Sequence, residues 1–263
     1  TSTTPVLTDI VPNGNRTVID LYQAGGIPAL MKELKELDQY CISKNIELRA
    51  CIQTLAHLGR LKRHSNYEPL FEIDDIFTVK DPKVYELIDK MFDTISKTFT
   101  SKKVHIGMDE AWALGRGKLL DKYGLLAKSK IMNSHLKRVS SLASKYGFEC
   151  DIWADMLLTA YNESSDKENF KMQIPENITP ILWRYWEKTP EASMEELETY
   201  QKFCDCKLGY AGGSQKWSGF VPSNRYSILF LSSKSSGSGI IGDLTLTLTF
   251  TDLPSLIFDL NIE

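Results

Sequence analysis

The feature that most constrains the fold is a regular alternation of β-rich runs with stretches of helical period. Five runs rich in β-branched and other apolar residues begin near residues 46, 103, 149, 178 and 207. Around these runs, apolar residues recur at helical spacing over about 28–44, 84–95, 128–146 and 193–204. Strands that alternate with helices in this way are typical of a parallel α/β architecture.

A (β/α)₈ barrel fits this alternation better than a dinucleotide-binding sheet. No Gly-rich fingerprint follows the first expected strand. The length of 263 residues is close to the ~250 of a typical barrel. We therefore predict one barrel domain, or most of one, over residues 1–263. The run Leu244–Phe250 alternates with a period of two, which indicates a half-exposed strand rather than a strand of a barrel interior.

Composition argues against several classes of partner. A formal net charge of −3 gives no basic field to hold nucleic acid or an anionic membrane surface. The sequence contains no run of 18 apolar residues, so it predicts no membrane-spanning helix. The first residues lack both a Met and a signal-peptide pattern, and the five cysteines are sparse. We expect reduced thiols, a cytoplasmic location, and a chain that was processed or is a piece of a longer one.

The clearest candidate for chemistry is the segment His105–Glu110, at the C-terminal end of an expected strand. In a barrel this end opens onto the active site. Asp109 and Glu110 would face opposite ways in an ideal strand, but both can turn toward the barrel mouth where the strand breaks into a loop. Repulsion and partial burial would then push their pKa values apart, as sugar chemistry requires. A solvated acidic pair at a helix start is the alternative.

Aromatic residues form the second clue, because they stand at or just after successive expected strand ends. Flat aromatic rings bind the apolar faces of sugars, while polar groups bind the hydroxyls. Packing between the barrel and its helices is the other explanation for each of them. The residues are Trp153, Trp183, Tyr185, Trp186 and Trp217.

The four histidines do not form a recognisable metal-binding pattern. A metal-dependent barrel hydrolase commonly has an H-x-H pair on an early strand, and none occurs here. His57 follows the first expected strand, so it either faces the barrel mouth or is a structural histidine. His135 lies within an expected helix, and we interpret it as structural.

Taken together, these segments resemble glycoside hydrolase family 20, the β-N-acetylhexosaminidases. The segment His105–Glu110 matches the family signature H-x-G-x-D-E. The segments Cys51–Leu58, Asp151–Met156 and Tyr210–Phe220 are similar to the branch that contains hexosaminidase D and small bacterial exo-hexosaminidases. The resemblance covers about residues 30–228.

The resemblance implies a substrate-assisted retaining mechanism, in which the 2-acetamido oxygen of the substrate attacks the anomeric carbon. In this mechanism Asp109 would orient and stabilise the acetamido group. Glu110 would protonate the leaving oxygen and then deprotonate the incoming water. Substrates would be glycans or glycosides that end in N-acetylglucosamine or N-acetylgalactosamine.

The same resemblance implies which side chains surround the sugar. Trp153, Trp183 and Trp217 would form the walls of the acetamido pocket, and Tyr185 would donate a hydrogen bond to the acetamido oxygen. Lesser substrate contacts would come from His57 and Asp155. No metal or organic cofactor would be needed.

Departures from the family pattern predict an incomplete barrel. The family has a sugar-binding arginine on its first strand and two βα units before the segment that contains His57, whereas only 45 residues precede Ile46. Arg184 stands where relatives have an acid, no Trp follows Trp217, and residues 229–263 form an atypical tail.

These departures leave two alternatives open. The first is an inactive or truncated relative that only binds amino sugars. The second is a barrel glycosidase in which Asp109 and Glu110 work with a conventional carboxylate nucleophile.

Overall fold

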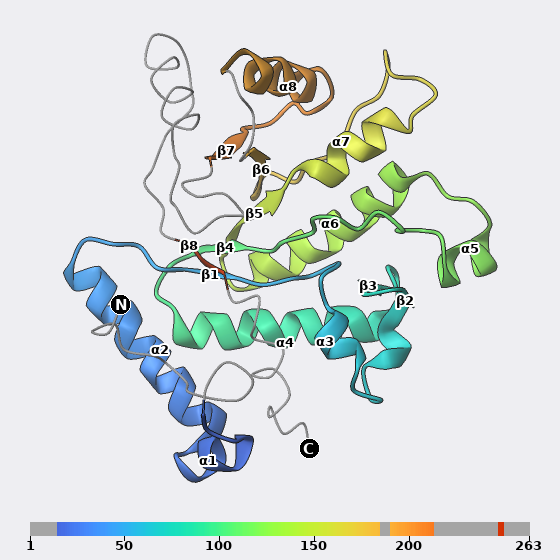
Figure 1. Ribbon diagram of the computed structural model, residues 1–263. Helices are drawn as coiled ribbons and strands as arrows, with labels where there is room; N and C mark the ends of the chain where they lie inside the picture. Colours follow the sequence, from blue (N-terminus) through green and yellow to red (C-terminus); the bar gives the residue numbers. More distant parts are fainter. Residues whose placement is uncertain (1–14, 185–189, 213–246, 250–263) are drawn as a thin grey trace.

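A computed structural model describes residues 15–184, 190–212 and 247–249, and its centre is a parallel β-sheet (Figure 1). Six strands lie in the order β7-β6-β5-β4-β1-β8, and every neighbouring pair is parallel. The strands are β1 (Arg49–Cys51), β4 (Lys103–His105), β5 (Glu149–Trp153), β6 (Ile178–Arg184), β7 (Gly209–Gly212) and β8 (Thr247–Thr249).

The helices between these strands pack side by side along the sheet. Helix α4 contacts α2 on one side and α6 on the other, and α6 in turn contacts α7 (Figure 1). This arrangement is that of a (β/α)₈ barrel wall, in which each strand is followed by an outer helix. The main helices are α2 (Gly26–Ser43), α4 (Pro82–Thr98), α6 (Lys128–Lys145), α7 (Asp155–Asn162) and α8 (Pro190–Phe203).

Helix α4 shows why these segments are helical. Asp81 caps its N-terminus by accepting a hydrogen bond from the backbone N–H of Lys83, and Pro82 occupies the first helical position. One face carries the buried residues Val84, Ile88, Met91, Phe92 and Ile95. This apolar stripe covers the sheet, so packing rather than propensity stabilises the helix.

The predicted order of strands and helices is confirmed. Strand β5 has the predicted bounds, while β1 is shorter than the apolar run from Ile46 that predicted it. Helix α6 ends as predicted at the turn before Gly147, whose φ is +72°. The alternating run Leu244–Phe250 contains β8, which pairs with β1.

Several short elements were not predicted from the sequence. The strands β2 and β3 form an antiparallel hairpin between β1 and α4. The others are single-turn or two-turn helices. These elements are α1 (Val18–Gln23), α3 (Gly59–Lys62), the 3₁₀ helix η1 (Glu68–Leu70), β2 (Phe71–Ile73), β3 (Ile76–Phe77) and α5 (Lys118–Tyr123).

Within the described ranges, the sheet has fewer strands than the eight that close a barrel. This confirms the predicted α/β fold with an incomplete barrel. In the same ranges, no helix combines the length and the apolar character needed to cross a membrane.

Candidate active site

The candidate site lies at the carboxyl ends of four neighbouring strands. His57 follows β1, Asp109 and Glu110 follow β4, Asp155 follows β5, and Trp183 belongs to β6. Because these strands are parallel and adjacent, their carboxyl ends lie along one edge of the sheet. This edge is where barrel enzymes place their active sites.

A left-handed turn after β4 presents the two acids. The φ angles of Gly107, Met108 and Glu110 are +69°, +75° and +54°. For residues other than glycine this conformation costs roughly 1–3 kcal/mol each, and it persists only where the surroundings impose it. In a regular strand the side chains of Asp109 and Glu110 would point to opposite faces. The turn instead brings both side chains into contact with His57.

Gln53 holds this turn in place. Its Nε2 donates to Asp109 Oδ1 at 3.1 Å, and its Oε1 accepts from the backbone N–H of Met108 at 3.3 Å. A Cβ atom added to Gly107 would lie 2.0 Å from the same Oε1, so any other residue there would displace the Gln53 side chain from its two hydrogen bonds. The sequence analysis did not identify Gln53 as a site residue. Its position just after β1, four residues before His57, was a signal that it lies at the active-site end of the strand.

His57 connects the two acids. Its Nε2 lies 3.1 Å from Asp109 Oδ2 and 3.5 Å from Glu110 Oε2. The backbone of His57 is also left-handed, with φ of +60°. Of the two alternatives that the sequence left open for His57, the structure supports the one that faces the site.

These contacts shift the pKa values of the pair in opposite directions. The hydrogen bond to Asp109 raises the pKa of His57 despite partial burial, and the charges of Asp109, Glu110 and Asp75 act in the same direction. Burial alone would raise the pKa of Asp109, but hydrogen bonds from His57 and Gln53 outweigh it and lower the value. Asp109 is therefore a carboxylate at neutral pH.

Asp155 connects the acid pair to the aromatic residues. Its Oδ2 accepts from the backbone N–H of Glu110 at 2.9 Å, and its Oδ1 accepts from Trp183 Nε1 at 3.3 Å. Burial raises the pKa of Asp155 to about 6, although the two hydrogen bonds oppose this shift. Both oxygens of Asp155 thus have donors from the protein itself.

Trp153 lies beside the first residue of the signature segment. The ring centres of Trp153 and His105 are 4.3 Å apart. His105 accepts a hydrogen bond from the backbone N–H of Gly107 through Nδ1, and burial lowers its pKa to about 4. His105 is therefore a neutral ring that packs against Trp153 and supports the turn.

The structure thus brings together five of the predicted site residues through direct contacts and places Trp153 beside them through His105. The five are His57, Asp109, Glu110, Asp155 and Trp183. Tyr185 and Trp217 lie outside the described residues. The structural interpretation of His135 is confirmed, because this buried ring bonds to the carbonyl oxygen of Thr54 and the hydroxyl of Tyr85.

Replacing Gly107 by alanine tests the contact between Gln53 and the turn. We expect Gly107→Ala to lower the free energy of unfolding by roughly 1–3 kcal/mol more than Gly147→Ala, measured by chemical denaturation. Gly147 is a matched control because its φ of +72° is similar and its added Cβ would meet no atom within 4 Å. Equal losses in the two variants would contradict the proposed contact.

The pairing of His57 with Asp109 is testable by titration. In Asp109→Asn the pKa of His57 should fall, because its strongest charged acceptor is gone, and an NMR titration of the imidazole resonances measures this change. The buried His135, with a pKa lowered to about 4, is an internal control that should not titrate between about pH 5 and 8.

The pairing also has a consequence for stability. Because folding raises the pKa of His57 and lowers that of Asp109, the pair stabilises the fold at pH values between the two, and this contribution is lost on either side. If the pKa of His57 in Asp109→Asn equals that in the unchanged protein, His57 and Asp109 are not paired.

Comparison with known proteins identifies solved structures of the same fold. Solved structures with a similar fold include a β-N-acetylhexosaminidase from Bacteroides fragilis NCTC 9343, with a TM-score of 0.54 and 15% identity, over 74% of this chain and 40% of that one. Another β-N-acetylhexosaminidase gives a TM-score of 0.51 and 15% identity, over 77% and 45%. A chitobiase from Flavobacterium johnsoniae gives 0.51 and 14%, over 70% and 28%.

These similarities establish the fold. The chain spans less than half the length of each of these structures. No curated protein sequence matches the chain. Residues 32–206, which are more than half of the 263 residues, match the model of the glycosyl hydrolase family 20 catalytic domain. The chain therefore belongs to glycosyl hydrolase family 20.

Proposed function

We propose that the protein is an exo-β-N-acetylhexosaminidase that removes terminal N-acetylglucosamine or N-acetylgalactosamine with retention of configuration. The observation that carries this proposal is the pair Asp109–Glu110, held at the barrel mouth by Gln53, His57 and Asp155. Membership of family 20 supports the reaction class. Two of the similar structures are named as β-N-acetylhexosaminidases, which supports the substrate class.

Asp109 is suited to orient the acetamido group. Its side chain is 18% exposed, and each of its oxygens already accepts one hydrogen bond, from Gln53 or from His57. A carboxylate oxygen has a second lone pair, so Asp109 can still accept from the acetamido N–H. This bond would place the acetamido oxygen for attack on the anomeric carbon.

Glu110 is suited to transfer the proton. Its side chain is 42% exposed, more than twice that of Asp109, and it faces His57 at 3.5 Å. We infer that Glu110 protonates the leaving oxygen in the first step and removes a proton from water in the second. The first step requires no nucleophile from the protein and no cofactor, because the attacking oxygen belongs to the substrate, and water is the nucleophile of the second step.

Asp155 acts on this pair by positioning it. The predicted substrate contact of Asp155 stays a prediction, and its two oxygens accept hydrogen bonds from the backbone N–H of Glu110 and from Nε1 of Trp183. We therefore assign it the role of fixing the backbone of Glu110 and the indole of Trp183 relative to each other. Trp153 and Trp183 would form walls of the acetamido pocket, and the predicted roles of Tyr185 and Trp217 stay predictions.

Hydrolysis of 4-nitrophenyl β-N-acetylglucosaminide tests the proposal. The protein should release 4-nitrophenol, and Glu110→Gln should reduce kcat by roughly 10²–10⁴-fold, because the general acid is lost. The matched control is Glu149→Gln, which changes an exposed carboxyl at the opposite end of β5 and should leave the rate unchanged. Absence of turnover in a folded sample would refute the activity.

One inhibition measurement and one binding measurement distinguish the proposed mechanism from the two alternatives. A thiazoline that mimics the oxazolinium intermediate should inhibit hydrolysis, whereas a glycosidase with a carboxylate nucleophile would be insensitive to it. Calorimetric binding of N-acetylglucosamine without hydrolysis would identify a protein that only binds amino sugars.

The raised pKa of Asp155 predicts the acid side of the pH profile. Above about pH 6 its carboxylate accepts both hydrogen bonds, whereas protonation removes an acceptor, so kcat/KM should fall below this pH. In Asp155→Asn the rate should be lower and the decline near pH 6 should disappear. The control Asp121→Asn, at an exposed carboxyl in α5, should keep the decline. Persistence of the decline in Asp155→Asn would exclude this role.

A further inference from the structure

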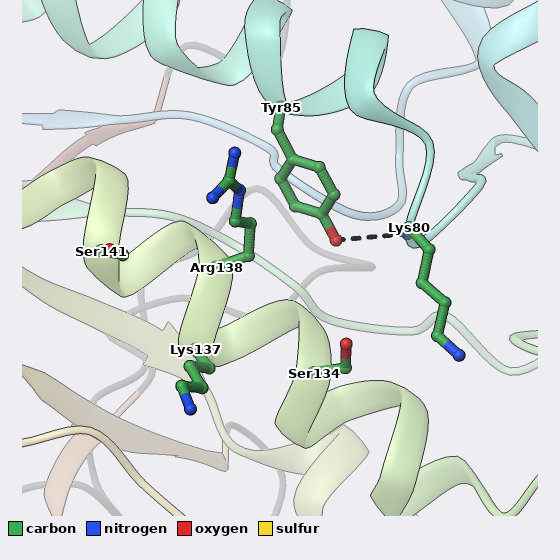
Figure 2. A pocket seen from close by; sticks show the side chains of 6 residues that line it. All are labelled: Lys80, Tyr85, Ser134, Lys137, Arg138 and Ser141. Carbon is green, nitrogen blue, oxygen red and sulfur yellow. Dashed lines mark hydrogen bonds between the residues drawn. The ribbon is translucent and has the colours of Figure 1, made fainter.

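A polar cavity lies on the outer surface, between α6 and the start of α4 (Figure 2). Its volume is about 340 Å³. Its lining side chains come from α4, α6 and the turn before α4 (Figure 2), and none of them belongs to the candidate active site, so the two sites are distinct. It is lined by Lys80, Tyr85, Ser134, Lys137, Arg138 and Ser141.

The cavity is lined by three cations and no carboxylate. Within the described ranges none of the three forms an ion pair. The ammonium of Lys80 lies 5.0 Å from the centre of the Tyr123 ring. Uncompensated positive charge in a concave site raises the local concentration of anions.

The pattern of α6 explains how four of the lining residues share one face. Ser134, Lys137, Arg138 and Ser141 are spaced i, i+3, i+4 and i+7, which places them on one side of the helix. This spacing usually marks the apolar stripe of a helix, but here it carries two hydroxyls and two cations. Arg138 points toward Tyr85 of the neighbouring helix, whereas Lys137 points away from it (Figure 2).

Tyr85 is fixed by the core and in turn positions Arg138. His135 Nε2 lies 3.0 Å from the carbonyl oxygen of Thr54 and must donate to it, so its Nδ1 accepts from the Tyr85 hydroxyl at 3.2 Å. The same hydroxyl accepts from the backbone N–H of Lys80 at 3.4 Å. The guanidinium of Arg138 lies 5.6 Å from the centre of the Tyr85 ring, within the range of a cation–π interaction.

We propose that this cavity binds the phosphate monoester of a small polar molecule. An arginine fork and two hydroxyls match the oxygens of a tetrahedral oxyanion, and the two lysines add charge that favours a dianion. A volume of about 340 Å³ is at the lower end for small-molecule sites and leaves room for the esterified group as well as the phosphate.

Calorimetric titration with glycerol 3-phosphate at low salt tests the proposal, because this probe contains no sugar ring for the active site. We expect saturable binding that weakens as salt is added. Inorganic phosphate should bind more weakly, and glycerol should not bind. The double variant Lys137→Gln/Arg138→Gln should weaken binding by about tenfold, since it removes two charged donors from exposed positions.

A second double variant separates the site from the overall charge of the protein. Lys35→Gln/Lys90→Gln removes the same charge from exposed positions on α2 and α4 outside the cavity, and it should bind as tightly as the unchanged protein. Equal weakening in both double variants, or no saturable binding, would overturn the proposal. Inorganic sulfate that binds as tightly as glycerol 3-phosphate would also overturn it. Circular dichroism of each variant checks the fold, and no measurement depends on hydrolysis.

Discussion

The left-handed turn at Gly107–Glu110 depends on Gln53, and the rest of the site depends on that turn. Strands β1 and β4 are paired with Cys51 opposite His105, so the residues that follow each strand meet at a fixed offset. Gln53 then reaches both the backbone of Met108 and the carboxylate of Asp109. A slip of one residue between the strands would turn Gln53 to the other face of the sheet and remove both bonds.

The same small region separates the electrostatic behaviour of two acidic side chains. Asp109 is partly buried, but a histidine and an amide donate to it, and its pKa falls. Asp155 is partly buried with only neutral donors, and its pKa rises. Carboxyl groups with divergent pKa values in one site are a common basis for acid–base chemistry. Burial destabilises the charged form of Asp155, yet this is the form that accepts hydrogen bonds from both Glu110 and Trp183.

The sequence predicted those parts of the fold that follow a period. Helices α4 and α6 carry long apolar stripes, and β5 is a continuous run, so their positions were evident. The hairpin of β2 and β3 was missed because Asp74 and Asp75 occupy its turn instead of the Asn-Gly or Asp-Gly pairs that signal such turns. The acid pair was found from its motif.

The supports of the acid pair were harder to predict. The left-handed backbone at Met108 and Glu110 has no signal in residues of these types. The contact of Gln53 with this turn joins distant parts of the chain, and local patterns do not reveal it.

The order of strands has a consequence for folding kinetics. From β1 to β7, neighbours in the sheet follow one another along the chain, so each βα unit can add to the unit before it. Strand β8 instead pairs with β1 from the far end of the chain. Closing this loop costs more entropy than joining neighbouring βα units, and the cost comes before any contact is gained. We therefore expect the edge of the sheet at β1 to be completed last, after the strands that carry the acid pair have assembled.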